Sequence, residues 1–413
     1  MTRSRKLRLS LLGAGISMAL VAAYLPAAAQ SSNAASPAFG KLFNAASAAL
    51  SSGQFAAATR DVNQAAALPG NNAYEQFAIV QMRAAIAAKS GDTAGALSAY
   101  IDEVNSGRLE AGTALQVTEA IVGFEYTLKN YAEAATWADR YYHQGGSDSR
   151  LKSVQIGAHY LNGDYAGAQR LQQAVINAEL RAGQTPSEND FDMLYSCAAG
   201  LKDAAGADAI MRQAVIYYPK PNYWEKLVQN VTNADGFDHD RFDYDAGLLN
   251  DATKSLTTAD DYMSLIQVAL QGGHSGMAQK LFNEGNTAGV LGTGTTAAVA
   301  RQQRLQKLIT TTMANDRANE KANLADAATN GSMAATVGYN LVDLGQLDQG
   351  IALMQKGLEM GVNVPSVVRL RLGEAQALSG NTAAAIKTFG TVTGTNGAAG
   401  LAQLWIIHLT QKA

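Results

Sequence analysis

Two glycine-rich segments contain residue types that enzymes use for catalysis. Residues 272–276 read Gly-Gly-His-Ser-Gly, which approaches the Gly-x-Ser-x-Gly turn that exposes a nucleophilic serine, but Met277 occupies the position of the last glycine. Residues 289–296 have the glycine spacing of a phosphate-binding loop, but Thr295 stands where the lysine is required, and no strand pattern precedes it. We therefore interpret the first segment as a turn between helices and the second as a flexible connection.

Residues 235–245 form the one marked cluster of charge. Alternate acidic residues can converge on a hard cation such as calcium, and the candidate ligands here are Asp238, Asp240, Asp243 and Asp245. Their spacing does not match an EF-hand loop, and no glutamate closes the cluster. The alternative is a long solvated loop whose last aspartate caps the following helix. No cofactor is expected.

The histidines and the single cysteine do not indicate a metal or catalytic site. None of the five histidines forms a His-x-x-x-His pair or pairs with Cys197, so the sequence gives no support for zinc. Cys197 lies in an apolar helical pattern, which predicts a buried structural thiol. Because no catalytic motif is complete, we predict a protein without enzymatic activity; catalytic residues dispersed over the chain are the alternative.

Several aromatic residues in the middle of the chain have the types favoured in binding surfaces. Tyrosine and tryptophan offer a large rigid contact area with a polar tip. The candidates are Trp137, Tyr141, Tyr142, Tyr223 and Trp224. At helical spacing, such residues more often pack between neighbouring helices, so core packing is the competing interpretation.

The first 29 residues have the pattern of a cleavable Sec-type signal peptide. Four basic residues before Leu9 precede an apolar stretch to Leu25, and residues 26–29 (Pro-Ala-Ala-Ala) offer a cleavage site near Ala29. We therefore expect export to the periplasm and no integral membrane segment after cleavage. A polar linker, residues 30–38, should follow.

The composition favours many closely packed helices and argues against nucleic acid as a partner. The chain has 413 residues, 7 prolines, 7% aromatic and 16% charged residues, and much of its 47% hydrophobic fraction is alanine. Its net charge is −3, and loss of the basic leader makes it more negative. A mildly acidic protein without a basic run is a poor match for nucleic acid or anionic lipid.

One short pattern recurs along the chain and organises it. A glycine or lysine ends one apolar-periodic segment, and a polar residue directly after it can cap the next helix. That polar residue falls at Gln54, Asp92, Asn130, Asp164, Asp203, His274, Gln346 and Asn381. Most intervals are 34 to 39 residues, whereas two, of 71 and 72 residues, are doubled. The doubled intervals predict one degenerate helix pair each: residues 223–228 with 244–252, and residues 297–312 with 315–328.

These repeats resemble those of the tetratricopeptide-repeat (TPR) superfamily. The last repeat carries the family marks most fully, with Leu372-Gly373 in its first helix and Ala385 with Phe389 in its second. Ala278 with Phe282 repeats the second-helix pair, but the family's first-helix tryptophan is absent and several intervals exceed 34 residues. The resemblance implies an all-α fold: an α-solenoid of about ten stacked helix-turn-helix repeats, with residues 398–411 as a capping helix.

The expected organisation has three helical segments after the linker. Residues 39–219 and 331–413 carry TPR-like repeats, and residues 220–330 carry degenerate repeats with acidic and Gly/Thr-rich loops. The resemblance implies a scaffold or adaptor whose concave face binds a protein or peptide in a cell-envelope assembly. The alternative is a periplasmic protein that binds glycan or peptidoglycan through the mid-chain aromatic residues. The partner, the pathway and the oligomeric state do not follow from the sequence.

Overall fold

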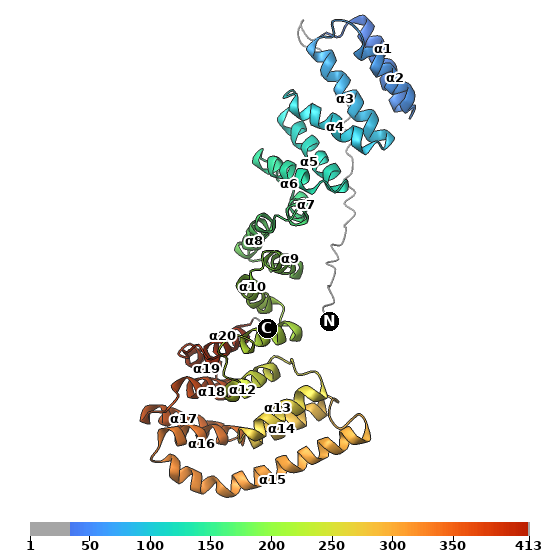
Figure 1. Cartoon of the computed structure of the whole chain (residues 1–413). Coiled ribbons are helices and arrows are strands. Elements are labelled where there is room, and N and C mark those ends of the chain that lie inside the picture. Colours follow the sequence, from blue (N-terminus) through green and yellow to red (C-terminus); the bar gives the residue numbers. More distant parts are fainter. Residues whose placement is uncertain (1–33, 412–413) are drawn as a thin grey trace. The chain divides into compact units, whose positions relative to one another are not determined.

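The chain folds into helices joined by short turns (Figure 1). A computed structural model describes residues 34–411, and every regular element in that range is an α-helix. The twenty helices of this range are α1 Pro37–Ser51, α2 Phe55–Ala66, α3 Ala73–Ser90, α4 Thr93–Asn105, α5 Ala111–Thr127, α6 Tyr131–His143, α7 Ser149–Leu161, α8 Tyr165–Arg181, α9 Glu188–Gly200, α10 Ala204–Tyr217, α11 Pro221–Thr232, α12 His239–Ala252, α13 Ala259–Gln271, α14 Ser275–Thr287, α15 Thr296–Ala327, α16 Gly331–Asp343, α17 Leu347–Met360, α18 Pro365–Leu378, α19 Thr382–Phe389 and α20 Ala398–Thr410.

The recurring polar residue is the N-cap of the second helix in all eight copies of the turn. These N-caps precede α2, α4, α6, α8, α10, α14, α17 and α19. The residue before each one has a positive φ, including the two lysines, Lys129 at 64° and Lys202 at 57°. The left-handed residue ends the first helix, and the polar residue starts the second. The predicted helix-turn-helix repeat is therefore confirmed.

The turn between α7 and α8 shows how the side chain of the cap works. Gly163 has a φ of 84°, and the Asp164 carboxylate accepts a hydrogen bond of 2.9 Å from the Gly167 N–H. The other carboxylate oxygen of Asp164 lies 2.7 Å from His159 Nδ1. The bond from Gly167, followed by that to His159, lowers the pKa of Asp164 below its ordinary value. The ionised carboxylate is therefore the form that caps α8.

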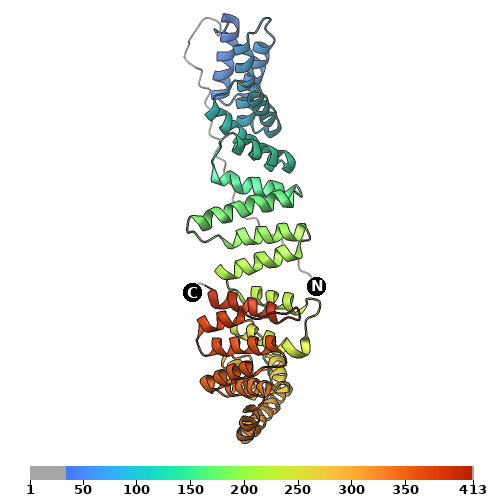
Figure 2. The same cartoon turned by 90° about the vertical axis from the view of Figure 1, so that its left-hand side faces the viewer.

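The described chain divides into two compact units, with the border inside α9. Unit 1 comprises residues 34–182 and 196–202, and unit 2 comprises residues 183–195 and 203–411. Within each unit, successive helices stack on one another (Figure 2). The expected segment borders after residues 219 and 330 both fall inside unit 2, because the degenerate repeats share one apolar core with the later repeats.

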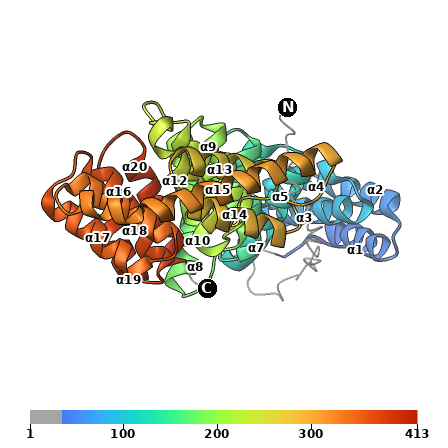
Figure 3. The ribbon, with the colours of Figure 1, turned by 90° about the horizontal axis from the view of Figure 1, so that it is seen from below.

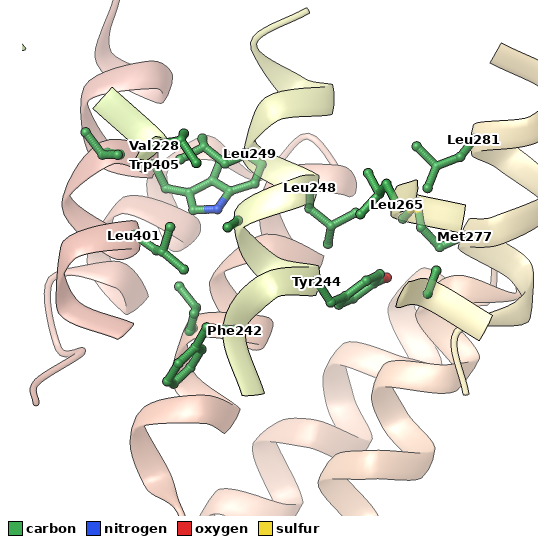
Figure 4. Packing of buried hydrophobic residues seen from close by; sticks show 14 of the residues in the cluster. Val228, Phe242, Tyr244, Leu248, Leu249, Leu265, Met277, Leu281, Leu401 and Trp405 are labelled. Carbon is green, nitrogen blue, oxygen red and sulfur yellow. The ribbon is translucent and has the colours of Figure 1, made fainter. Parts of the chain in front are cut away.

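Unit 2 closes on itself through its last helix. α20 packs against α18 and α19 and also against α10, α11 and α12. Its Trp405 stacks on Phe389, with 5.7 Å between ring centroids, and lies in the same apolar cluster as Val228 and Leu249 (Figure 4). The backbone adds one link, a 3.1 Å hydrogen bond from the Asp238 N–H to the Asn396 carbonyl. The predicted final helix is confirmed, and it closes unit 2 in addition to covering the last pair.

The first degenerate pair is present, but the second is not. α11 and α12 occupy the residues expected for the first pair. The prediction of two helices, at residues 297–312 and 315–328, is wrong. This segment forms one helix of 32 residues, α15 (Figure 3). Residues 312–316 contain neither glycine nor proline, and the helix continues through Asn315, the residue there that most readily takes a left-handed conformation. The long connection expected between residues 235 and 245 is also wrong, because α12 begins at His239.

α15 contacts its neighbours along a narrow stripe. It packs on α14 at one end and on α16 at the other, through residues such as Leu305, Ile309 and Ala327. Polar contacts supplement this stripe: Gln302 Oε1 accepts from the Gly292 N–H at 2.7 Å, and Ser275 donates to Asp316. α15 therefore takes the place of a helix pair between the repeats on either side.

The N-terminal predictions fall mostly outside the described range. The signal peptide, residues 1–29, lies outside it, and so do residues 30–33 of the linker. α1 begins at Pro37, with Ser36 as its N-cap, two residues before the expected start of the repeats at residue 39. Between residues 34 and 411, no helix is both long and apolar enough to cross a lipid bilayer.

The close crossing of α16 and α17 depends on two glycines in each helix. The two glycines of each helix are seven residues apart. They are Gly331 and Gly338 in α16, and Gly350 and Gly357 in α17. A Cβ at Gly338 would lie 2.7 Å from the Gly350 carbonyl oxygen, and one at Gly357 would lie 2.6 Å from the Gly331 carbonyl oxygen. The two backbones are therefore in direct contact, and any side chain larger than hydrogen would separate them.

The substitution Gly338→Ala should destabilise unit 2 because the new methyl group would overlap the backbone of α17. We expect a loss of about 1–3 kcal/mol in the free energy of unfolding, the usual cost of overpacking. Urea denaturation of the whole chain, followed by circular dichroism, measures it. Gly40→Ala in α1 is the control: a Cβ there meets nothing within 4 Å, so better helix propensity should leave stability unchanged or slightly higher.

Asp164→Ala should destabilise α8 by removing its N-cap. The expected cost at neutral pH is about 1 kcal/mol. Because the pKa of Asp164 is lowered in the fold, its contribution is present above the unfolded pKa and is lost as the pH falls through the folded pKa. The wild type and the variant should therefore converge in stability at a pH below the ordinary aspartate pKa of about 3.9. The matched control is Gln54→Ala, because Gln54 caps α2 without a side-chain hydrogen bond. An equal loss of unfolding free energy in both variants would contradict the role of the Asp164 side chain as the N-cap of α8.

Candidate functional site

The histidine and serine of the hydrolase-like segment do not form a catalytic pair. His274 is the N-cap of α14, and its Nδ1 lies 2.6 Å from Asp343 Oδ2. Ser275 is buried and donates a hydrogen bond to Asp316 in α15. The two side chains thus engage different carboxylates on different helices. Both hold the turn against its neighbours, as the interpretation of this segment as a helix turn requires.

The phosphate-loop-like segment and Cys197 also have structural roles. Residues 289–296 connect α14 to α15, and Leu291 within them is buried in the core of unit 2. Cys197 is a free, buried thiol, and burial raises its pKa to about 11. A thiol with so high a pKa is a poor nucleophile at neutral pH. The prediction of a buried structural thiol is confirmed.

A network of buried polar side chains joins α12, α14, α16 and α18 in unit 2. Its ionic centre is Arg371 of α18, whose Nε donates to Asp245 Oδ1 at 3.1 Å and whose Nη2 donates to Asp245 Oδ2 at 3.5 Å. Asp245 is 0% exposed. Arg371 also donates to the Arg241 carbonyl at 3.4 Å, and its guanidinium lies 5.4 Å from the Tyr339 ring centroid. This ion pair links residues 126 positions apart in the chain.

The aromatic rings and the remaining acids complete the network. Tyr244 stacks on His274 with 4.1 Å between ring centroids, and its hydroxyl lies 3.5 Å from Asp343 Oδ1. Tyr339 meets the His274 ring edge-on and donates to Glu374 Oε2 at 2.9 Å. Figure 4 shows Tyr244 beside the apolar side chains of the same core. The network is therefore enclosed by apolar packing.

Burial dominates the electrostatics of this network. It raises the pKa of Asp343, although the hydrogen bond to His274 acts in the opposite direction. It also raises the pKa of Glu374 well above its ordinary value, with a further increase from the charge of Asp245. The pKa values of Tyr244 and Tyr339 are raised well above 10, first by burial and then by the nearby acids. The network holds titratable groups but does not present them to solvent, so it suits structural closure rather than substrate binding.

The aspartates proposed as calcium ligands do not converge. Asp238 pairs with Arg241, and Asp243 pairs with His239 on the same helix, whereas Asp245 points into the core toward Arg371. Asp240 lies exposed in the first turn of α12. Between residues 34 and 411, no group of three or more His, Cys, Asp or Glu side chains could hold a metal ion. The calcium hypothesis receives no support from this arrangement.

The aromatic candidates of unit 1 lie in α6 and pack mainly inward. Trp137 is 8% exposed, and Tyr141 is buried beside it in the same apolar cluster. Tyr142 is half-buried; its hydroxyl donates to the Asp148 carbonyl at 2.7 Å, and Lys152 Nζ lies 3.4 Å from its ring centroid. These rings stabilise the contact between α6 and α7.

The aromatic candidates of unit 2 lie in α11. Trp224 is 1% exposed and meets His408 of α20 edge-on. Tyr223 is half-buried and donates to Glu188 Oε1 at 2.6 Å, an acceptor that Lys220 also contacts. Because neither Trp137 nor Trp224 exposes a ring face, the sugar-stacking surface required by the glycan hypothesis is not present at these residues.

An open groove lies on the surface of unit 2. It has a volume of about 630 Å³ and lies among α10, α11 and the segment that leads into α20. Its apolar part includes Val231 and the half-buried ring of Phe237. Gly397 and Gly400 let α20 approach, because a Cβ at Gly397 would overlap Phe237 and one at Gly400 would lie 2.9 Å from Val231.

Hydrogen-bonding side chains lie beside the apolar part of the groove. Asp208 accepts from Arg212 Nε at 2.5 Å and from Asn230 Nδ2 at 2.9 Å, so these three side chains hold one another in place. Lys226 and Asn233 are exposed on the α11 side of the groove. A fixed polar cluster, an exposed cation and an apolar surface together can bind an extended or helical peptide segment.

Sequence reasoning did not identify the groove or the buried network. The groove brings residues near position 208 together with residues near position 395, and no local pattern predicts that closure. One signal for the network was available: Arg371 and Glu374 lie three residues apart among the buried Leu370, Leu372 and Ala375 of α18. Charged residues within such a stretch are expected to have buried partners.

Solved helical-repeat structures are similar to this chain. A tetratricopeptide repeat protein from Parabacteroides merdae is 10% identical, with 83% of this chain and 100% of that chain covered and a TM-score of 0.30. Yeast Tom70 is 10% identical, with 89% and 95% covered and a TM-score of 0.21. The TPR2AB domain of yeast Sti1, in a complex with pHSP90, is 15% identical, with 72% and 99% covered and a TM-score of 0.21. No protein-family model matches the chain, and no curated protein matches its sequence.

These low TM-scores add no argument about the fold. The capped turns and the packing of consecutive helices establish it directly. Within each unit, the described chain is an all-α array of stacked helix-turn-helix pairs.

Removal of the cation from the buried network should strongly destabilise unit 2. Arg371→Met leaves Asp245 buried without its partner, and breaking one side of a buried ion pair typically costs about 3–5 kcal/mol. Urea denaturation followed by tryptophan fluorescence measures the loss, because Trp224 and Trp405 both lie in unit 2. Arg369→Met, two positions earlier in α18 and outside the network, should change the unfolding free energy by less than about 1 kcal/mol. Similar losses in both variants would refute the role of the ion pair.

Proposed function

We propose that this chain is an exported, non-enzymatic scaffold that binds a protein or peptide partner in a bacterial cell-envelope assembly. The observation that carries the proposal is the groove among α10, α11 and the segment before α20. Stacked helix pairs provide a rigid frame for such a surface.

The interior of unit 2 is not available to a partner. α20 closes the unit, and the polar network and apolar core fill the space between α12, α14, α16 and α18. A partner of unit 2 must therefore dock on the outside, where the groove lies.

The chemistry of the groove favours a peptide segment over a small apolar ligand. Asp208, Arg212 and Asn230 form a fixed polar cluster, whereas Lys226 carries a charge that is free to approach an acidic group. Val231 and Phe237 offer apolar contact beside them. A peptide supplies both kinds of group along one backbone.

The leader supports the envelope part of the proposal. Basic residues, an apolar stretch and a small-residue exit are the three parts of a Sec-type signal, and they direct a protein across the inner membrane. Cys197 is the only cysteine, so the exported protein would need no disulfide to fold.

Recovery of a partner from the periplasm tests the proposal. The full-length chain, with its own leader and a C-terminal tag, is produced in a Gram-negative host and isolated from the periplasmic fraction after crosslinking. A double variant, Ala205→Trp with Lys226→Glu, fills the groove and reverses its exposed charge. We expect the wild type to retain a partner in stoichiometric amount and the double variant to lose at least nine-tenths of it.

The matched control places the same charge reversal elsewhere on unit 2. Lys356→Glu alters an exposed lysine of α17 that is remote from the groove-lining residues, and it should retain the partner fully. Equal retention by all three proteins would exclude the groove. Absence of the chain from the periplasmic fraction would refute the export part of the proposal independently.

A further inference from the structure

Two buried carboxyl groups in unit 2 receive different sets of hydrogen-bond donors. Asp245 receives two from Arg371, one at each carboxylate oxygen. Glu374 receives one at Oε2, from the Tyr339 hydroxyl. Glu374 Oε1 is buried and accepts from no donor. An ionised carboxylate with an oxygen buried in this way would lack the compensation that buried charge requires.

The charged and titratable groups around this pair come from four helices of unit 2. α12 contributes Asp245 and Tyr244, and α14 contributes His274 at its N-cap. α16 contributes Tyr339 and Asp343, and α18 contributes Arg371 and Glu374 itself. His274 hydrogen-bonds with Asp343 through Nδ1. Arg371 is then the one permanent cation of the network, and it is committed to Asp245.

We propose that Asp245 and Glu374 share one proton, with Glu374 Oε1 donating it to the Asp245 carboxylate, so that the pair forms a proton-dependent clasp between α12 and α18. Oε1 then needs no donor, because it carries the hydrogen itself. The chain of hydrogen bonds from Tyr339 through Glu374 and Asp245 to Arg371 becomes continuous. The clasp carries no net charge beyond the balanced pair of Arg371 and Asp245.

The proton binding of the pair gives a defined dependence of stability on pH. Burial first, and then the charge of and hydrogen bond to Asp245, raise the pKa of Glu374 well above its ordinary value. A raised folded pKa means that the folded chain keeps a proton that the unfolded chain releases above about pH 4.3. The stabilising contribution is therefore complete below that pH and is lost as the pH rises through the folded pKa. Alkaline conditions should loosen the clasp.

The isosteric variant Glu374→Gln tests this directly, because its amide can donate to Asp245 at any pH. Both proteins carry Trp137→Phe, which leaves Trp224 and Trp405 of unit 2 as the only fluorescent tryptophans. Urea denaturation of the full chain is followed at pH 5, 6, 7 and 8. The ratio of the wild-type unfolding constant to that of the variant should increase with pH above about 4.3, by up to about tenfold per pH unit, and should level off above the folded pKa of Glu374. A ratio that stays constant over this range would overturn the proposal.

Two further measurements keep the test independent of how well the variant folds. Glu359→Gln removes an exposed glutamate of α17. The ratio of the wild-type unfolding constant to that of this variant should not change with pH. Infrared spectroscopy at pH 6, above the ordinary glutamate pKa of about 4.3, should show in the wild type a protonated-carboxyl band in addition to that of Glu103, whose pKa burial raises to about 7. Asp245→Asn frees Arg371 to pair with Glu374, so this variant should lose the band. Its absence from the wild type would refute the shared proton.

Discussion

The left-handed residue at the end of each first helix is the constraint on which the rest of the structure depends. It reverses the chain within two residues and places a polar cap at the start of the second helix, as Gly163 and Asp164 do between α7 and α8. Each reversal lays two helices against each other, and neither can bury its apolar side alone. The stacking of pairs follows from that requirement. Where the reversal is missing, the pair is missing too, as α15 shows.

The sequence predicts local features of this fold well. The capped turn depends on two adjacent residues, so a pattern of glycine or lysine followed by a polar residue located eight helix starts correctly. The same local logic identified α11, α12 and α20 and the burial of Cys197. The prediction failed at residues 297–328. The doubled interval between capped turns required two helices there, but the apolar periodicity continues across the expected break and the segment forms one helix. Spacing alone does not end a helix, and neither does the presence of Asn315, a residue that can take the left-handed conformation.

Features that depend on distant pairing could not be predicted in this way. Asp245 meets Arg371 only because unit 2 closes through α20, and the groove depends on the same closure. Asp245 belonged in the sequence to an acidic cluster and was grouped with its neighbours, yet its side chain points away from them into the core. Trp224 was a candidate for binding, yet it packs beneath α20. In both cases residue type was informative, whereas the direction of the side chain was decided by tertiary contacts.

The position of α20 limits how this architecture can change in length. In an open array of repeats, either end presents an apolar face on which another helix pair can stack. In unit 2, α20 packs against α10, α11 and α12 as well as α18 and α19, so an extra pair inserted before it would push it away from one of these partners. Modular growth by duplication is therefore compatible with unit 1, whereas unit 2 must keep its number of helices to stay closed.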